Sequence, residues 1–373
     1  MKPFWPLILS ILAAMFGVAA PVRGHSPLLR EAIGLNGDAM FIDSGAPGMV
    51  LVVVRGQDTV IEGYGETTKG NGHKPDGKSL LRLGSITKVF TGEMLASLAT
   101  EGKVRLTDPL RMHGAGASVP KFGDREITLL DLATHSAGLP REMPNAAPLL
   151  TWPTRADRWS WLSKYSLAWA PGTVAAYSNV GFDLLADALV AAGGKSYSEL
   201  LKERITGPLG MTDTGFNPNK EQCERLMTGS GLGGAAPCLD TEAIAGGGGL
   251  YSTAEDMAKW LRHNLATSDP ATWPVLALAH AVYLQRQAMT AAIGFDEGGP
   301  MAGIGLGWIT VAAQGHLPMI MQKSGSLAGF MTYIAFAPGR DVGVFVAVNR
   351  ADFVMLFGLT AAVNGLIANL VTR

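Results

Sequence analysis

Strand-like sequence lies at both ends of this chain and helix-like sequence lies between them, an order that strongly limits how the chain can fold. Strand patterns occur near the start and again near the end, at 48–58, 59–67, 305–313, 329–338 and 341–349. Between them, three segments have apolar residues at helical spacing, at 86–102, 179–194 and 253–265. We therefore predict an α/β (α+β) fold in which one sheet, assembled from both chain ends, is interrupted by a mostly helical inserted lobe.

The chain shows no internal repeat and no low-complexity linker, which predicts one folded unit with two lobes. We place this domain at 25–373. Its sheet lobe comprises about 25–84 and 301–373, and its helical lobe about 85–300.

The two ends also indicate where the protein works. Residues 1–24 combine Lys2, an apolar stretch and small residues at 22 and 24, which is typical of a secretory signal peptide. An uncleaved membrane anchor is the alternative. Residues 353–371 carry no charge, but two asparagines and a threonine dilute the run. We expect this segment to be a helix that lies on the sheet rather than a second membrane span.

Several classes of protein are excluded by composition and motifs. The chain has 30 Lys and Arg, 31 Asp and Glu, and only 16% charged residues, without a basic run, so we expect no nucleic-acid partner. It has no GxSxG, no HExxH and no CxxC, so a lipase-type nucleophile elbow and a zinc site are unsupported. We expect neither a metal nor a cofactor.

The only two cysteines are Cys223 and Cys238. An exported chain works where disulfides persist, and the intervening segment is flexible enough to close a loop, so we predict a disulfide between them. Two free thiols are the alternative.

A candidate nucleophile lies at the start of the first predicted helix. Ser85 and Lys88 form an SxxK motif there, so their side chains share one helical face. The helix N-terminus adds backbone N–H groups for a developing anion. A second SxxK, at Ser118 and Lys121, contains Pro120 and is predicted to be a loop.

Two further motifs follow in the chain. Tyr177-Ser178-Asn179 is the only YxN, and Lys323-Ser324-Gly325 is the only K[ST]G, just before the strand predicted at 329–338. Three such motifs in this order are rare by chance.

This triplet resembles that of the class C β-lactamase and low-molecular-weight penicillin-binding protein family. The segments 153–162, 175–189 and 207–216 and the cysteine pair resemble its AmpH-type branch of D-alanyl-D-alanine carboxypeptidase/endopeptidases. The resemblance covers nearly the whole mature chain and implies a β-lactamase/transpeptidase-like fold with an antiparallel sheet. Ser324 stands where the family usually has threonine, but it keeps the hydroxyl group that would recognise a substrate carboxylate.

Chemistry and this resemblance together suggest the roles of the catalytic candidates Ser85, Lys88, Tyr177, Asn179 and Lys323. Ser85 is the expected nucleophile. Either Lys88 or Tyr177 is the base, with its pKa lowered by burial or by nearby positive charge. Asn179 is expected to hold the substrate amide and to orient Lys88.

The resemblance also implies a substrate-binding strand with Ser324, Gly325 and Ser326. The backbone N–H groups of Ser85 and Ser326 would form the oxyanion hole. His135 is interpreted as structural rather than as a base.

The function implied is a periplasmic serine D-alanyl-D-alanine carboxypeptidase/endopeptidase that binds penicillin. Its expected partners are peptidoglycan stem peptides and β-lactams. The alternatives are a class C-type β-lactamase, an esterase on the same scaffold and a non-hydrolytic penicillin receptor, because all share the acylation machinery. We expect a monomer in the periplasm, and peripheral association with the inner membrane stays open.

Overall fold

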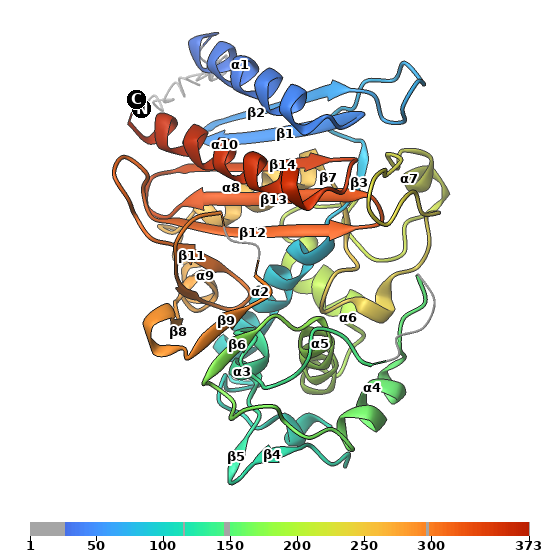
Figure 1. Cartoon of the computed structure of the whole chain (residues 1–373), viewed down its shortest axis with the longest axis vertical. Coiled ribbons are helices and arrows are strands. Elements are labelled where there is room, and N and C mark those ends of the chain that lie inside the picture. The colour runs from blue at the N-terminus through green and yellow to red at the C-terminus, as the bar shows by residue number, and fades with distance from the viewer. Residues whose placement is uncertain (1–26, 115, 145–149, 296–297, 373) are drawn as a thin grey trace, which may run out of the picture.

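The computed structural model describes residues 27–114, 116–144, 150–295 and 298–372. The predicted signal peptide at 1–24 lies outside these residues. In the described part of the chain, an eight-stranded antiparallel sheet forms the centre of one lobe, and a group of helices forms the other (Figure 1). The predicted α+β fold with an antiparallel sheet is confirmed.

Both ends of the chain build this sheet, as predicted. In spatial order its strands are β2 (Asp58–Gly65), β1 (Gly48–Arg55), β14 (Val342–Val348), β13 (Phe330–Ala337), β12 (Ile320–Leu327), β11 (Ile309–Val311), β10 (Met301–Ile304) and β8 (Leu284–Gln285). The join between the two ends is the β1–β14 pair, in which Val52 lies opposite Phe345. The antiparallel hairpin of β1 and β2 forms one edge of the sheet.

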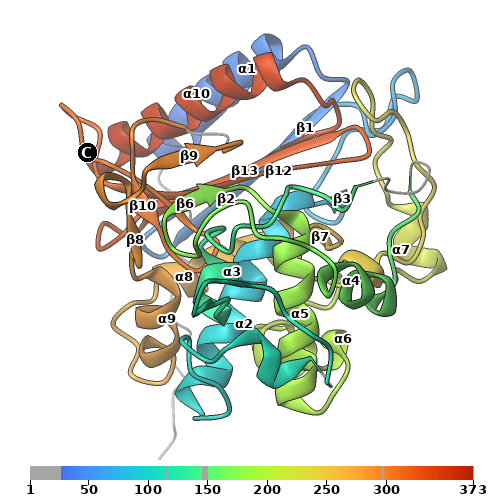
Figure 2. The same ribbon diagram turned by 60° about the horizontal axis from the view of Figure 1, so that its bottom comes forward.

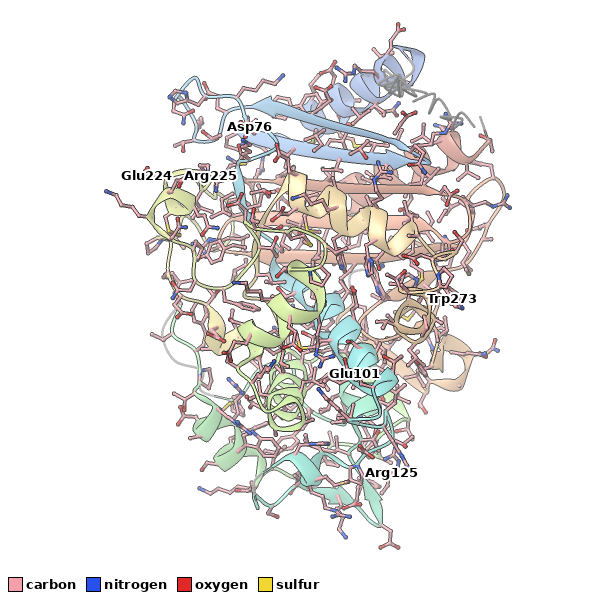
Figure 3. All side chains as sticks on the ribbon, turned by 180° about the vertical axis from the view of Figure 1, so that it is seen from behind. Asp76, Glu101, Arg125, Glu224, Arg225 and Trp273 are labelled. Carbon is pink, nitrogen blue, oxygen red and sulfur yellow. A yellow bond between two sulfur atoms is a disulfide. The ribbon has the colours of Figure 1, made fainter. Side chains whose placement is uncertain are left out.

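Both faces of the sheet are covered, which explains why β1 is apolar at nearly every position. Helices α1 (Pro27–Ser44) and α10 (Phe353–Val371) lie on one face (Figure 2). Helix α8 (Ala254–Leu265) crosses the other face of the sheet, which is turned toward the reader in Figure 3. Alternate residues of β1 therefore enter two cores: Val52 packs in the core on the α8 side, whereas Leu51 packs in the core beneath α1 and α10.

The uncharged C-terminal segment forms α10, as predicted. Among the described residues it is the one helix long and apolar enough to cross a bilayer, and 50% of its most apolar window is buried. It packs on β13 and β14 and beside α1. Asn364 shows why the helix carries polar residues, since its side chain accepts a hydrogen bond from the Tyr333 hydroxyl at 2.9 Å and donates one to the Gly298 carbonyl at 2.7 Å.

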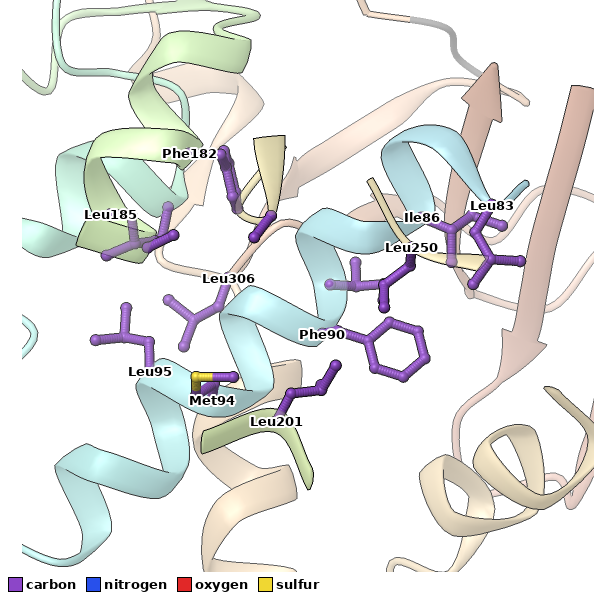
Figure 4. Packing of buried hydrophobic residues seen from close by; sticks show 14 of the residues in the cluster. Leu83, Ile86, Phe90, Met94, Leu95, Phe182, Leu185, Leu201, Leu250 and Leu306 are labelled. Atoms are coloured by element: carbon purple, nitrogen blue, oxygen red, sulfur yellow. The ribbon is translucent and has the colours of Figure 1, made fainter. Parts of the chain in front are cut away.

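The helical lobe is organised around α2 (Thr87–Thr100), which is buried on nearly all sides. Figure 4 shows Phe90, Met94 and Leu95 of α2 among leucines of other segments and Phe182 of α5 (Asn179–Gly193). The remaining helices are α3 (Leu129–Ala133), α4 (Arg155–Leu162), α6 (Tyr197–Leu201), α7 (Lys220–Glu224) and α9 (Trp273–His280). Three small strand pairs lie outside the main sheet: β3 (Leu80–Arg82) with β7 (Tyr251–Thr253), β4 (Lys121–Phe122) with β5 (Arg125–Glu126), and β6 (Val174–Ala176) with β9 (Ala291–Ile293).

Two elements differ from the prediction in ways that matter for the site. Lys323-Ser324-Gly325 does not merely precede a strand but lies inside β12, which pairs with β13 from Met321 to Leu327. The polar residues and glycine of this segment hide the strand pattern. Helix α8, although it falls in the range assigned to the helical lobe, packs on β1 and β14 of the sheet.

The structure contains the predicted disulfide between Cys223 and Cys238, which closes a loop over 15 positions of sequence. The loop packs against the turn between β12 and β13, where the Ser230 N–H donates to the Gly329 carbonyl at 3.1 Å. Near its other end, Arg82 donates to the Pro237 carbonyl at 2.6 Å.

Replacing both cysteines by serine is expected to lower the free energy of unfolding by about 3 kcal/mol, because the unfolded chain regains the freedom of that loop. Denaturant unfolding of Cys223→Ser/Cys238→Ser measures the effect. Reduction and alkylation of the parent should reproduce the loss and should leave the double variant unchanged. Equal stability of all three forms would contradict the prediction.

Candidate active site

Ser85 lies in a tight turn at the entrance to α2. The turn spans Gly84–Ile86 and continues directly into the helix. Gly84 has a φ of 54°, a backbone conformation that glycine adopts without strain. A Cβ atom at Gly84 would also lie 2.5 Å from the backbone nitrogen of Ser326. Glycine therefore allows the turn carrying Ser85 to lie directly against β12.

Lys88 is fully buried one turn after Ser85. Its Nζ atom donates to Ser85 Oγ at 3.3 Å, to Asn179 Oδ1 at 2.6 Å and to the backbone carbonyl of Gly247. Burial lowers the pKa of Lys88, and Lys323 lowers it further, whereas Tyr177 acts in the opposite direction. The sequence predicted the Ser85 and Asn179 contacts but not the one with Gly247.

Tyr177 is buried between two lysines. The Nζ atoms of Lys88 and Lys323 lie 4.9 and 4.8 Å from the centre of its ring, and Lys323 Nζ is 3.4 Å from its hydroxyl oxygen. Burial alone would raise the pKa of Tyr177. The two lysines and a hydrogen bond with Ser85 outweigh it and lower the pKa to about 8. Lys88 and Tyr177 both reach Ser85, so both retain the geometry expected of the base.

Asn179 begins α5, behind the N-cap residue Ser178. Its side chain is held at both ends, because Oδ1 accepts from Lys88 and Nδ2 donates to the carboxylate of Glu142. These two contacts fix which side of the amide faces Lys88. Glu142 is a site residue that the sequence analysis missed, since a single acid in a loop carries no recognisable signal.

Strand β12 brings the predicted substrate-binding residues to Ser85. Ser324 is buried within it, Gly325 faces the turn before α2, and Ser326 lines the cleft. A Cβ atom at Gly325 would lie 2.1 Å from the carbonyl oxygen of Leu83 and 3.0 Å from the backbone nitrogen of Ser85. The strand and the turn are therefore in direct backbone contact, an arrangement that puts the N–H groups of Ser85 and Ser326 beside one cleft.

His135 supports the Tyr177 segment rather than Ser85. Its ring stacks on the Tyr177 ring with centroids 4.4 Å apart, and its Nδ1 accepts from the backbone N–H of Ser178 at 2.9 Å. Its carbonyl accepts from the N–H of Ala176 at 2.9 Å. Burial, with the positive charges of Lys88 and Lys323 nearby, holds its pKa well below the ordinary value. A neutral imidazole with Nδ1 already engaged agrees with the structural role predicted for His135.

A cleft of about 390 Å³ opens in front of Ser85 and Asn179. Apolar side chains including Trp152 and Leu327 line it together with charged ones, among them Asp183. Of the predicted site residues, Ser85, Asn179 and Ser326 line this cleft. Lys88 contacts Ser85 and Asn179 directly, and Lys323 contacts Tyr177. The second SxxK motif is not part of the cleft and lies outside any helix. Within the described ranges, no three His, Cys, Asp or Glu side chains are grouped so that they would hold a metal ion.

Comparison with known proteins agrees with this geometry. The model of the family described as "Beta-lactamase" matches residues 31–367. The chain is 43% identical to the D-alanyl-D-alanine-carboxypeptidase/endopeptidase AmpH of Escherichia coli K12 over 337 residues, covering 89% of this chain and 87% of AmpH. It is 27% identical to an E. coli K12 beta-lactamase, with coverage of 82% and 84%. A crystal structure of a beta-lactamase/D-alanine carboxypeptidase from Yersinia pestis, complexed with citrate, superimposes with a TM-score of 0.87 at 41% identity, covering 93% of this chain and 100% of that one.

Proposed function

The chain belongs to the beta-lactamase family, and we propose that it is a serine D-alanyl-D-alanine carboxypeptidase/endopeptidase that acts on peptidoglycan stem peptides and is acylated by β-lactams. The observation that carries the proposal is the contact of Ser85 with both Lys88 and Tyr177, at a cleft bordered by β12. This arrangement supplies a nucleophile, a base and an anion site within reach of one substrate carbonyl.

The reaction proceeds in two halves. The Ser85 oxygen attacks the carbonyl carbon of the penultimate D-alanine, and its proton passes to Lys88 or Tyr177. The N–H groups of Ser85 and Ser326 stabilise the oxyanion. The C–N bond then breaks, the leaving amine takes up the proton, and an ester to Ser85 remains. Water attacks this ester, which releases the shortened peptide and restores the serine hydroxyl.

Both named activities use the same steps and differ in the amine that leaves. In the carboxypeptidase reaction the leaving amine is free D-alanine, and its carboxylate is the group that Lys323 and Ser324 would hold. In the endopeptidase reaction it belongs to a second peptide.

The enzyme's expected preference for peptides over β-lactams follows from the deacylation step. A peptide product departs and admits water, whereas the leaving group of a β-lactam stays tethered and obstructs it.

Steady-state kinetics with a pentapeptide stem, an ester and a cephalosporin test this proposal. We expect the highest kcat/KM on the pentapeptide and slow release of the cephalosporin acyl group. Every 1.36 kcal/mol added to the deacylation barrier slows it about tenfold. A cephalosporin turned over far more efficiently than the pentapeptide would establish the β-lactamase alternative, and efficient turnover of the ester alone would establish the esterase.

The proposed place of action is the periplasm. The signal-like residues 1–24 and the cysteine pair support it, because disulfides persist in that compartment. Fractionation of cells that express the full chain tests it, and recovery in the cytosol with reduced cysteines would contradict it. The monomeric state and peripheral association with the inner membrane stay predictions.

A further inference from the structure

A buried acid lies one turn behind Asn179 on α5. Asp183 is 7% exposed, and its Oδ1 atom accepts the backbone N–H of Gly247 at 2.9 Å. The carbonyl of the same glycine accepts a hydrogen bond from Lys88. Asp183 therefore holds in place the glycine whose carbonyl accepts a hydrogen bond from Lys88. Asp183 itself belongs to none of the three sequence motifs.

Helix α5 thus holds Lys88 at two points. Asn179 contacts Nζ directly at 2.6 Å, and Asp183, four residues later on the same helical face, acts through Gly247. The packing at Gly247 is close. A Cβ atom there would lie 3.2 Å from Asp183 Oδ1 and 3.3 Å from the carbonyl oxygen of Asn179. The glycine cannot shift far toward α5 without meeting one of these two atoms.

Asp183 is not needed as the ion-pair partner of α4. Arg158 of that helix pairs with Asp187, one turn further along α5, through contacts of 2.9 and 3.2 Å. Asp187 also accepts from the indole N–H of Trp159 at 3.0 Å. Asp187 is therefore the buried acid that binds α4 to α5. Asp183 instead contacts Gly247 and lines the cleft.

We propose that Asp183 is a positioning residue for acylation: it holds the Gly247 carbonyl against Lys88, and its carboxyl group sets how readily Lys88 gives up its proton. The inference deepens the proposed acyl-serine function and rests on it.

The charge of Asp183 depends on several neighbours. The titratable and charged groups that face it are Lys88 of α2, Arg158 of α4, Asp187 of its own helix, Glu142 of the loop before α4 and Tyr197 of α6. Burial raises the pKa of Asp183 to about 7, even though Arg158 and Lys88 lower it. The ionised carboxylate favours protonated Lys88, so its removal lowers the pKa of Lys88 and keeps the free amine available at lower pH.

Two substitutions separate the hydrogen bond from the charge. Asp183→Asn keeps an acceptor for the Gly247 N–H and removes the charge, whereas Asp183→Ala removes both. Asp187→Asn is the matched control, because it neutralises a buried acid of the same helix whose contacts lie away from Lys88. The measurement is the second-order rate constant for acylation by a fluorescent penicillin between pH 5.5 and 9, together with cleavage of a pentapeptide and the melting temperature of each variant.

For Asp183→Asn we expect a plateau rate close to the parent's, with the rise of the profile above about pH 7, where the parent's carboxyl group is ionised, displaced by about one pH unit toward lower pH. Asp183→Ala is expected to be acylated about tenfold more slowly at every pH, since the Gly247 N–H loses its acceptor. Asp187→Asn is expected to melt at a lower temperature and to show no displacement toward lower pH, because loss of the Asp187 charge favours the ionised form of Asp183.

An Asp183→Asn profile that superimposes on the parent's would overturn the electrostatic role, and parental rates in Asp183→Ala would overturn the positioning role. An equal displacement in Asp187→Asn would show a general effect of buried acids and would also overturn the inference. If the parent itself is neither acylated nor active on the pentapeptide, the proposed function fails, and the role of Asp183 fails with it. If the parent is acylated but the Asp183→Asn profile is not displaced, only the inference about Asp183 fails, and the proposed function stands.

Discussion

Replacing Ser85 by alanine is expected to abolish acylation and to lower peptide cleavage by at least about 10³-fold, because no other group takes the place of a covalent nucleophile. The side chain lies at the start of α2, within 3.3 Å of Lys88 Nζ, and the substitution removes only a partly exposed oxygen. The fold should therefore remain intact. Intact-mass spectrometry after exposure to penicillin checks the result, with one adduct expected in the parent and none in Ser85→Ala.

The chain contains a matched control for this variant. Ser118 begins the second SxxK motif but lies outside any helix, and Lys121 of that motif is exposed on β4. Ser118→Ala should form the parent's adduct at the parent's rate. An adduct that persists in Ser85→Ala, or one that maps to another residue, would contradict the assignment of the nucleophile.

If Tyr177 takes the proton of Ser85, replacing it by phenylalanine is expected to slow acylation by about 10²-fold or more, the range typical for loss of a positioned general base. The pH dependence gives the sharper test. A phenol acts as a base only when ionised, and the pKa of Tyr177 is lowered to about 8. Acylation by the parent should therefore rise with pH and level off above about pH 8, and Tyr177→Phe should lose this rise.

Tyr197→Phe is the control for a buried tyrosine. Its hydroxyl contacts Thr91 at 2.6 Å, and burial raises rather than lowers its pKa. The variant should keep both the rate and the pH profile of the parent. If Tyr177→Phe retains the rise near pH 8, the proton of Ser85 goes to Lys88, and Tyr177 acts through its hydrogen bonds instead.

Much of the fold follows from local sequence patterns. The helical spacing after Ile86 predicts α2, and Thr253 caps α8 as its position suggests, accepting from the N–H of Asp256 at 3.3 Å. The β-branched runs predict β1 and β14, since nearly continuous apolar sequence is what a strand covered on both faces requires. Strand β12 escapes prediction because the polar residues Lys323 and Ser324 and the glycine that follows them interrupt the apolar strand pattern.

The sequence by itself also predicted the candidate reactive groups, because each of the three motifs has a local signature. What it did not contain is the set of contacts that tune those groups. Glu142 contacts Asn179 across 37 positions of sequence, Asp183 contacts Gly247 across 64, and Gly247 contacts Lys88 across 159. No periodicity links positions so far apart.

Only the tertiary structure decided the electrostatics of the site. A tyrosine and two lysines in a sequence have ordinary pKa values, and the shifts of Lys88 and Tyr177 arise when burial removes water and folding brings both ammonium groups within about 5 Å of the tyrosine ring. The sequence determined which groups are present and which helix or strand carries most of them. The packing of α2, α5 and β12 determined their distances, and electrostatic interactions depend on distance and burial rather than on order along the chain.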